Sequence, residues 1–277
     1  MDTTLQALIM GIVQGLTEFL PVSSSGHLII VPALLGWTDP FINSLEFSVM
    51  LHIGTLVALL IYFRSDWLRL VPAGLAAIRD RSLRDDPDRR LAWLIAAATV
   101  PAIVAGVLFN DIIETNVRQI GLVALMLVVG GAILWLAERN GRQARSIAGL
   151  TFPAALGIGA AQAIALVPGI SRSGISISAG LFAGLDRESA ARFSFLMATP
   201  VTALAAAYEA RKLLSGETGL AIAVTPLIVG MVASLIAGLF AIGVLLRFVR
   251  SHPTDVFVAY RVLLAAVVIV AWLGLGR

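Results

Sequence analysis

The sequence of 277 residues contains no cysteine, and Lys212 is its only lysine. The missing cysteines exclude disulfide bonds, thiolate catalysis and cysteine-ligated metal. Charge is scarce as well, because 13% of the residues are charged, against roughly 25% in an average soluble domain. Since 58% of the residues are hydrophobic, the chain is expected to lie in a membrane.

Apolar stretches of about 20 residues, the length that crosses a bilayer, recur along the whole chain. They leave no soluble domain between them, so we expect one all-α integral membrane domain over residues 1–277. The net charge of +3 is small and forms no basic stripe. This pattern predicts contact with membrane lipids and no nucleic-acid partner.

Six segments are predicted to span the membrane, at about 47–63, 91–109, 118–137, 190–208, 220–246 and 256–275. Two further apolar segments, 4–34 and 150–185, are interrupted near their middles by Pro21 and by Pro168-Gly169, each followed by serines. Because proline and glycine interrupt helices, both segments are expected to be broken.

Basic loops indicate which ends of the spans face the cytoplasm. The segment 64–90, read as a loop, holds seven arginines, the loop 138–149 holds three, and the linker 247–255 adds Arg247 and Arg250. By contrast, 110–117 carries Asp111 and Glu114 and no basic residue. These loop assignments agree with one another only if each broken segment leaves the membrane on the side where it entered. We therefore predict that both broken segments are re-entrant helical hairpins and that both termini lie outside the cell. The outer loop 209–219, which contains Lys212, departs mildly from the rule.

An internal repeat supports this topology. A shift of 148 residues superimposes Gly11 on Gly159, Gln14 on Gln162, Ser23 on Ser171, Ser25 on Ser173, Gly26 on Gly174, Ile29 on Ile177, Gly36 on Gly184 and Phe47 on Phe195. We therefore predict repeat one at about 1–110, repeat two at about 150–246, and a last helix at 256–275. Three crossings separate the copies, so the second is inverted and the two broken tips can meet near the midplane.

The two tips read "VQGLTEFLPVSSSGH" (13–27) and "LVPGISRSGISIS" (166–178). Ionisable groups at membrane depth are costly and point to function. Arg172 lies between Ser171 and Ser173, beside Gly174, where a flexible turn with N–H groups, hydroxyls and a guanidinium suits a phosphate. The alternative is that Arg172 caps helix carbonyls or pairs with Glu18, and such a pair is compatible with an anion site.

Glu18 lies four residues after Gln14, so the two side chains share one helix face. The Glu18 carboxylate could accept a proton, orient a hydroxyl, or hold a divalent cation against a phosphate. Ser23, Ser24 and Ser25 suit helix capping, phosphate binding or nucleophilic attack. Ser24 is our first choice as nucleophile because it matches Arg172 in the repeat.

His27 ends the first tip where the second has Ile175, so the fold of the repeat does not require it. We predict that His27 acts as a general acid, a general base or a phosphate ligand. His52 and His252 lie outside both tips and are explained by polar packing and by a solvated loop. No G-x-x-x-x-G-K-[ST], H-E-x-x-H or G-x-S-x-G pattern occurs, which argues against nucleotide hydrolysis, zincin chemistry and an α/β-hydrolase.

The segments "QGLTEFLPVSSSGHL" and "PGISRSG" resemble the two signature regions of the undecaprenyl pyrophosphate phosphatases, the bacitracin-resistance membrane phosphatases of bacteria. The likeness covers nearly the whole chain in length and segment order. It implies that the enzyme hydrolyses the terminal phosphate of undecaprenyl pyrophosphate and so recycles the lipid carrier for cell-wall synthesis. It also implies a plasma-membrane location with the site open to the outer face, and support by a divalent cation (Mg²⁺ or Ca²⁺). A homo-oligomer is compatible with the sequence.

By position, the family's acidic motif falls on Gln14 and Glu18, its serine and histidine stretch on Ser23, Ser24, Ser25 and His27, and its arginine motif on Ser171, Arg172 and Ser173. Gln14 stands where some members have a second glutamate, so a mechanism needing two carboxylates is not supported and Glu18 would serve alone. Whether a serine, the histidine or water attacks is not decided by spacing.

Two rival functions can be compared with the sequence. A lipid phosphatase of the phosphatidic-acid type would need a histidine where this chain has Ser178, and a lysine before the site, whereas Lys212 follows both motifs. The other rival is an inverted-repeat transporter or flippase of an anionic lipid, in which the tips bind an anion without cleaving it.

Overall fold

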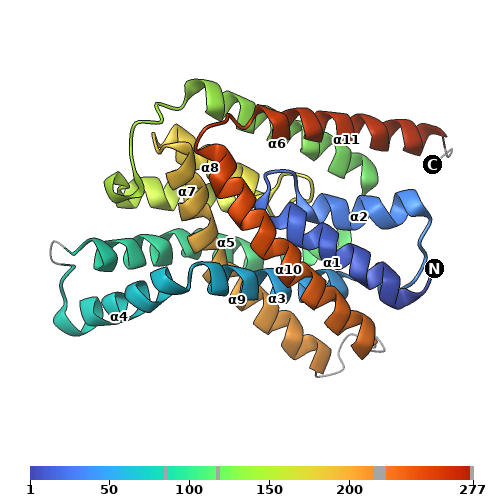
Figure 1. Cartoon of the computed structure of the whole chain (residues 1–277), viewed down its shortest axis with the longest axis horizontal. Coiled ribbons are helices and arrows are strands. Elements are labelled where there is room, and N and C mark those ends of the chain that lie inside the picture. Colours follow the sequence, from blue (N-terminus) through green and yellow to red (C-terminus); the bar gives the residue numbers. More distant parts are fainter. Residues whose placement is uncertain (84–85, 117–118, 215–222, 275–277) are drawn as a thin grey trace.

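The computed structural model describes residues 1–83, 86–116, 119–214 and 223–274, and within these ranges it contains helices and no β-strand. Figure 1 shows the arrangement of the helices. Their bounds are α1 (Thr3–Phe19), α2 (Ser24–Leu35), α3 (Leu45–Tyr62), α4 (Arg64–Asp80), α5 (Pro87–Asn116), α6 (Ile120–Asn140), the 3₁₀ turn η1 (Ile147–Gly149), α7 (Phe152–Ile164), α8 (Arg172–Phe182), α9 (Arg187–Leu214), α10 (Val224–Val249) and α11 (Asp255–Gly274).

Six of these helices are long and apolar enough to cross a membrane: α3, α5, α6, α9, α10 and α11. They confirm the six predicted spans and the all-α membrane class. Many large apolar side chains on these helices remain exposed on the protein surface, as expected where lipid replaces water.

The prediction that 64–90 is a loop was wrong, because this segment contains the helix α4 and the start of α5. The segment is arginine-rich but also amphipathic: the exposed side chains Leu68, Val71, Leu75 and Ile78 recur at helical spacing. The predicted loop 110–117 likewise begins inside α5, which continues to Asn116. The predicted loop 209–219 also begins inside a helix, because α9 continues to Leu214. The side chains of Asp111, Glu114 and Lys212, and residues 215–219, lie outside the described residues.

Both predicted interruptions are present, and they have the same geometry. Ser23 and Ser171 precede α2 and α8 with positive φ angles of 75° and 74°, a conformation that non-glycine residues seldom adopt. Each serine Oγ accepts a hydrogen bond from the backbone N–H three residues on, at Gly26 (3.3 Å) and Gly174 (3.1 Å). The serine and glycine pairs matched by the repeat therefore build the same cap. The re-entrant path and the inverted orientation stay predictions.

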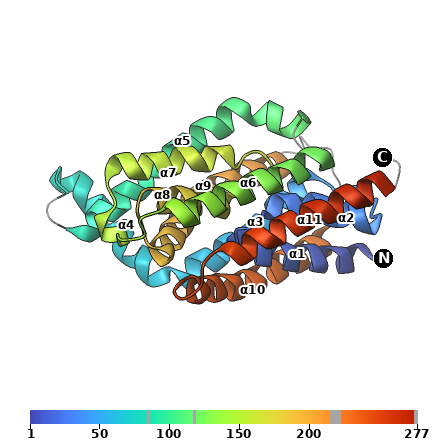
Figure 2. The same cartoon turned by 90° about the horizontal axis from the view of Figure 1, so that it is seen from above.

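The helices of the two copies pack reciprocally. The first helix of copy one, α1, packs on α10, and the first helix of copy two, α7, packs on α5 (Figures 1 and 2). The matched glycines lie at these contacts: a Cβ on Gly11 would overlap the carbonyl oxygen of Gly230, and one on Gly159 would overlap that of Ala98. Glycine at this repeated position thus permits both close crossings.

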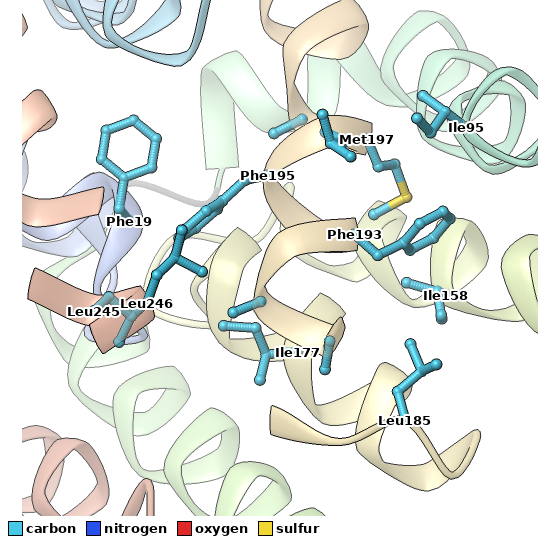
Figure 3. Close-up of a cluster of buried hydrophobic side chains, with 14 of the residues drawn as sticks. Phe19, Ile95, Ile158, Ile177, Leu185, Phe193, Phe195, Met197, Leu245 and Leu246 are labelled. Atoms are coloured by element: carbon cyan, nitrogen blue, oxygen red, sulfur yellow. The ribbon is translucent and has the colours of Figure 1, made fainter. Parts of the chain in front are cut away.

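An aromatic core lies directly behind the first break. Phe19, the last residue of α1, packs edge-on against Phe195 of α9 with ring centroids 5.3 Å apart (Figure 3). The ring centroid of Phe63 lies 6.3 Å from that of Phe195. All three rings are buried. Because Glu18 immediately precedes Phe19, this packing helps to fix the direction of its side chain.

The helix α11 packs beside α6 and brings Arg261, a residue of the last predicted span, to the breaks. Arg261 is fully buried, and its guanidinium donates to the carbonyl oxygens of Leu127, Pro21, Met126, Gly169 and Ile170 at 2.7 to 3.4 Å. Pro21 belongs to the first break, and Gly169 and Ile170 to the second. Arg261 therefore satisfies carbonyls that the interrupted helices leave unpaired.

The close crossing of α7 and α5 predicts a position-specific effect in two nearby glycines. Gly159→Ala should destabilise the protein by about 1 to 3 kcal/mol, because the added methyl group overlaps the α5 backbone. The matched control is Gly157→Ala, since nothing lies within 4 Å of a Cβ at Gly157. Thermal unfolding in detergent should show a lower Tm for Gly159→Ala alone, and equal Tm values would contradict the packing.

The Arg261 contacts predict that replacing this side chain lowers the stability of the fold. Arg261→Leu should leave five carbonyl oxygens without this donor and greatly reduce the yield of folded protein. Arg261→Lys should fold better but unfold at a lower temperature than the parent, because an ammonium cannot reproduce the fork. Unchanged Tm values for both variants would show that the contacts contribute nothing to stability.

Candidate functional site

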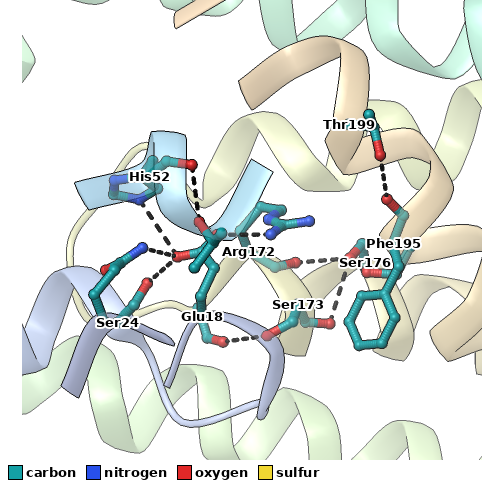
Figure 4. Close-up of polar contacts among 12 residues, drawn as sticks. Glu18, Ser24, His52, Arg172, Ser173, Ser176, Phe195 and Thr199 are labelled. Atoms are coloured by element: carbon teal, nitrogen blue, oxygen red, sulfur yellow. Dashed lines mark hydrogen bonds and ion pairs between the residues drawn. The ribbon is translucent and has the colours of Figure 1, made fainter. Parts of the chain in front are cut away.

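The predicted tips meet, and Glu18 is at the centre of their contact. It lies at the end of α1, is 6% exposed, and both of its carboxylate oxygens are engaged. Oε2 accepts from the Gln14 side chain (2.9 Å) and from the Ser24 hydroxyl (2.5 Å), while Oε1 accepts from Arg172 Nη2 (2.6 Å; Figure 4). Donors to both oxygens stabilise an ionised carboxylate.

Arg172 reaches this carboxylate from the first turn of α8 and therefore joins the two copies. Its second terminal nitrogen, Nη1, is buried and has no hydrogen-bond partner in the described part of the chain. A buried guanidinium N–H without an acceptor is costly, so it marks a place where an anionic oxygen would be bound favourably. The N-terminus of α8 adds a partial positive charge at the same point.

The predicted serines divide into two groups. Ser24 alone donates to Glu18, and it begins α2. Ser23 accepts from the N–H of Gly169 (3.2 Å), and Ser173 donates to the Leu20 carbonyl (3.0 Å). These two bonds run between the tips, so Ser23 and Ser173 hold the breaks together here.

The remaining predicted phosphate ligands lie close by. Ser25 contacts Ser23 (3.4 Å), Ser171 contacts Ser173 (3.2 Å), and Gly174 donates its N–H to Ser171. The Oε1 atom of Gln14 is buried and has no partner among the described residues. The phosphate-binding roles of Gln14, Ser23, Ser25, Ser171, Ser173 and Gly174 stay predictions.

His27 faces away from the Glu18 carboxylate, toward α11. Its Nδ1 is 2.7 Å from the Ser23 carbonyl oxygen, and its Nε2 is 2.7 Å from the Tyr260 hydroxyl. Both ring nitrogens are therefore engaged in contacts that fix the first break. The structure brings Gln14, Glu18, Ser24 and Arg172 together without His27, whose predicted acid–base role stays untested.

His52 contacts the central carboxylate of the site. We expected ordinary polar packing, but Nε2 of His52 lies 3.3 Å from Glu18 Oε2, and its Nδ1 lies 2.8 Å from the Ser48 carbonyl (Figure 4). The available signal was an ionisable side chain within an apolar span. His52, inside the apolar helix α3, carries this signal as the two tips do.

The cluster does not fit a resident divalent cation. No group of three or more His, Cys, Asp or Glu side chains that could hold a metal occurs among the described residues. Glu18 is the one carboxylate of this cluster, and Gln14, Ser24, His52 and Arg172 already surround its oxygens. The divalent cation implied by the resemblance stays a prediction.

The arrangement suits transfer of a phosphoryl group. The Ser24 hydroxyl lies in short contact with a carboxylate oxygen that could take its proton. The Arg172 guanidinium contacts the other carboxylate oxygen, and its Nη1 has no partner in the part of the chain that the structure describes. Positioned charge of this kind contributes most of the catalysis in phosphoryl transfer.

Comparison with known proteins gives a consistent result. The family model described as bacitracin resistance protein BacA matches residues 7–267. A Gemmatimonas aurantiaca protein named undecaprenyl-diphosphatase is 46% identical over 266 residues, which cover 96% of this chain and 97% of the relative. Proteins of the same name from Rubrobacter xylanophilus (46% identity, 95% of this chain and 96% of the relative) and Desulforudis audaxviator (43%, 96% of each) are similar over the same extent. The chain belongs to the bacitracin resistance protein BacA family.

Proposed function

We propose that this membrane protein hydrolyses undecaprenyl pyrophosphate to undecaprenyl phosphate and inorganic phosphate. The observation that carries the proposal is the carboxylate of Glu18, which joins the hydroxyl of Ser24 to a guanidinium with one unpartnered nitrogen. Relatives that match nearly the whole chain are named for this activity. The reaction recycles the lipid carrier of cell-wall synthesis and confers resistance to bacitracin, the property that gives the family its name.

The terminal phosphate binds where the two tips meet. Arg172 Nη1 donates to a phosphate oxygen while Nη2 stays on Glu18, so one guanidinium bridges substrate and base. The N-terminus of α8 contributes further stabilisation of negative charge. The polyprenyl tail lies in the lipid among the spans, which explains why a phosphatase site can be built at membrane depth.

Ser24 is the nucleophile that the geometry favours. Its Oγ attacks the terminal phosphorus, its proton passes to Glu18 Oε2, and the P–O bond to the bridging oxygen breaks, so undecaprenyl phosphate leaves. Glu18 gives this proton to the departing undecaprenyl phosphate and is again a carboxylate. A water molecule then attacks the phosphoserine, Glu18 takes a proton from this water and passes it to Ser24 Oγ, and Ser24 leaves as the hydroxyl with inorganic phosphate released. Arg172 compensates the negative charge in both steps.

The site opens to the outer face of the bacterial plasma membrane in this proposal. The arginine-rich segment around α4 and the arginines near 139–145 and 247–250 assign the opposite ends of the spans to the cytoplasm. The first tip is then entered from outside, where the pyrophosphate of a lipid carrier would become accessible after wall polymers are transferred.

Transport of an anionic lipid is the second candidate, because the reciprocal packing of two copies resembles the construction of secondary transporters. A transporter would bind the same pyrophosphate at Arg172 and leave it intact. The two functions therefore differ in one product, inorganic phosphate.

Purified protein in detergent is expected to release inorganic phosphate from a polyprenyl pyrophosphate, measured by a colorimetric phosphate assay. The monophosphate lipid should appear in equal amount by mass spectrometry, because one anhydride bond is cleaved per turnover. Binding of the lipid without phosphate release would favour the transporter.

Removing either charge of the central pair is expected to slow turnover. Arg172→Ala should lower kcat/KM by about 10² to 10³-fold, as loss of a transition-state donor does, and Glu18→Gln should do so at least as strongly because the base is lost. Both variants must keep the elution volume of the parent in size-exclusion chromatography. Near-normal rates in a folded variant would refute the assignment.

Ser24→Ala should lower kcat by about a thousandfold or more, since no hydroxyl is left to attack. The matched control is Ser65→Ala on α4, which is exposed and should leave the rate unchanged. Acid quenching during turnover should trap phosphate on the peptide that contains Ser24. A Ser24→Ala variant with a normal rate would instead indicate water as the nucleophile.

A further inference from the structure

His52 approaches the catalytic carboxylate from outside both tips. It belongs to α3, and its side chain is 25% exposed while that of Glu18 is 5% exposed. No residue of the two recognisable motifs lies on this helix. A histidine–carboxylate contact at this position therefore needs its own explanation.

The hydrogen bonds of the ring determine which nitrogen carries a proton. The Ser48 carbonyl oxygen, 2.8 Å from Nδ1, can only accept, so Nδ1 carries a hydrogen. Nε2 faces Oε2 of Glu18 at 3.3 Å, and an ionised carboxylate can only accept as well. The contact is favourable when Nε2 also carries a proton, which makes His52 a charged donor to Glu18.

The helix that carries His52 is well fixed. Ser234 of α10 donates its hydroxyl to the Leu51 carbonyl (2.9 Å), and a Cβ on Gly54 would overlap the Met231 carbonyl, so α3 and α10 are in close contact on both sides of His52. Glu18, in contrast, lies in the last turn of α1, directly before a break. A donor on a fixed span can therefore hold a side chain at a helix end.

The identity of the oxygen matters for the reaction. His52, Ser24 and Gln14 all contact Oε2, and His52 is the one of these three donors that lies on a different helix from both tips. Arg172 contacts Oε1, and its second nitrogen, Nη1, has no partner among the described residues. If Oε2 were released, the carboxylate could rotate to form a two-bond fork with Arg172, the arrangement that guanidinium and carboxylate prefer. Ser24 would then lose its proton acceptor, and the phosphate would lose its donor.

We infer that His52 is a positioning residue: by donating to Oε2 it keeps Glu18 directed at Ser24 and keeps one arm of Arg172 free for phosphate. The inference rests on the proposed function and adds to it a residue from α3. It requires a hydrogen-bond donor of suitable length at position 52 and does not require an imidazole as such.

The test compares four substitutions in the full-length protein by kcat/KM for phosphate release. His52→Leu, which has no donor, and His52→Asn, whose amide is too short, should each lose about tenfold to a hundredfold, as expected for a hydrogen bond to a charged group. His52→Gln restores a donor of suitable length and should stay within about threefold of the parent. His252→Leu, an exposed histidine in the turn after α10, is the control and should be unchanged.

A double variant separates positioning of Glu18 from a purely structural role of His52. In a Glu18→Gln background, His52→Leu should cost less than about twofold, because the group through which His52 acts is already removed. A normal rate in His52→Leu, an equally slow His52→Gln, or an additive loss in the double variant would each overturn the inference. If His52→Leu does not fold, His52→Asn and His52→Gln decide between the outcomes.

A second measurement is independent of turnover. The infrared carboxylate band of Glu18, obtained as the difference between the parent and Glu18→Gln protein, should shift in His52→Leu and His52→Asn and remain in place in His52→Gln. An unshifted band in all three variants would refute the inference even if the parent cleaved no pyrophosphate. If the parent released no phosphate but the band shifted as predicted, the proposed function would be refuted and the His52 contact would be established.

Discussion

The buried ion pair between Glu18 and Arg172 is the interaction on which the rest of the site depends. Each partner lies beside a broken helix of a different repeat copy, 154 residues apart in the chain. Arg172 without Glu18 would be an uncompensated ion in a largely apolar interior, which proteins seldom tolerate. The pair therefore requires the two tips to meet. Within the described residues the other guanidinium nitrogen, Nη1, has no partner, so the contact between the tips can also bind an anion.

The backbone around this pair shows how irregular chain can exist within an apolar protein. Each break exposes N–H and carbonyl groups that lipid cannot satisfy. Ser23 accepts from the opposite tip, Ser173 donates to it, and Arg261 donates to carbonyls of both. In these contacts the serine side chains and the long side chain of Arg261 bind backbone groups of the two tips. Glycines at Gly11 and Gly159 allow the helices that carry the tips to approach their partners closely.

The sequence predicted the features that are local or periodic. Six spans, two interruptions and the matched serine and glycine pairs followed from hydropathy and from the repeat, and the structure contains them. It also predicted that Gln14, Glu18, Ser24 and Arg172 come together. The side to which His27 points, the approach of His52 and the carbonyl contacts of Arg261 could not be predicted, because each depends on how α3 or α11 is placed against the tips. Neither helix carries a motif that indicates this placement. The helix α4 was not predicted, because an arginine-rich segment between two spans is typical of a cytoplasmic loop as well as of an amphipathic helix.

The central claim is that the unpartnered arm of Arg172 binds the pyrophosphate held between the two tips. Solid-state NMR can measure the dipolar coupling between ¹⁵N in arginine side chains and ³¹P in a bound, non-hydrolysable polyprenyl bisphosphonate. The account predicts a coupling typical of hydrogen-bonded N and P atoms, from one terminal nitrogen, that disappears in Arg172→Lys. A bound analogue without such a coupling, or a coupling that persists in Arg172→Lys, would contradict it.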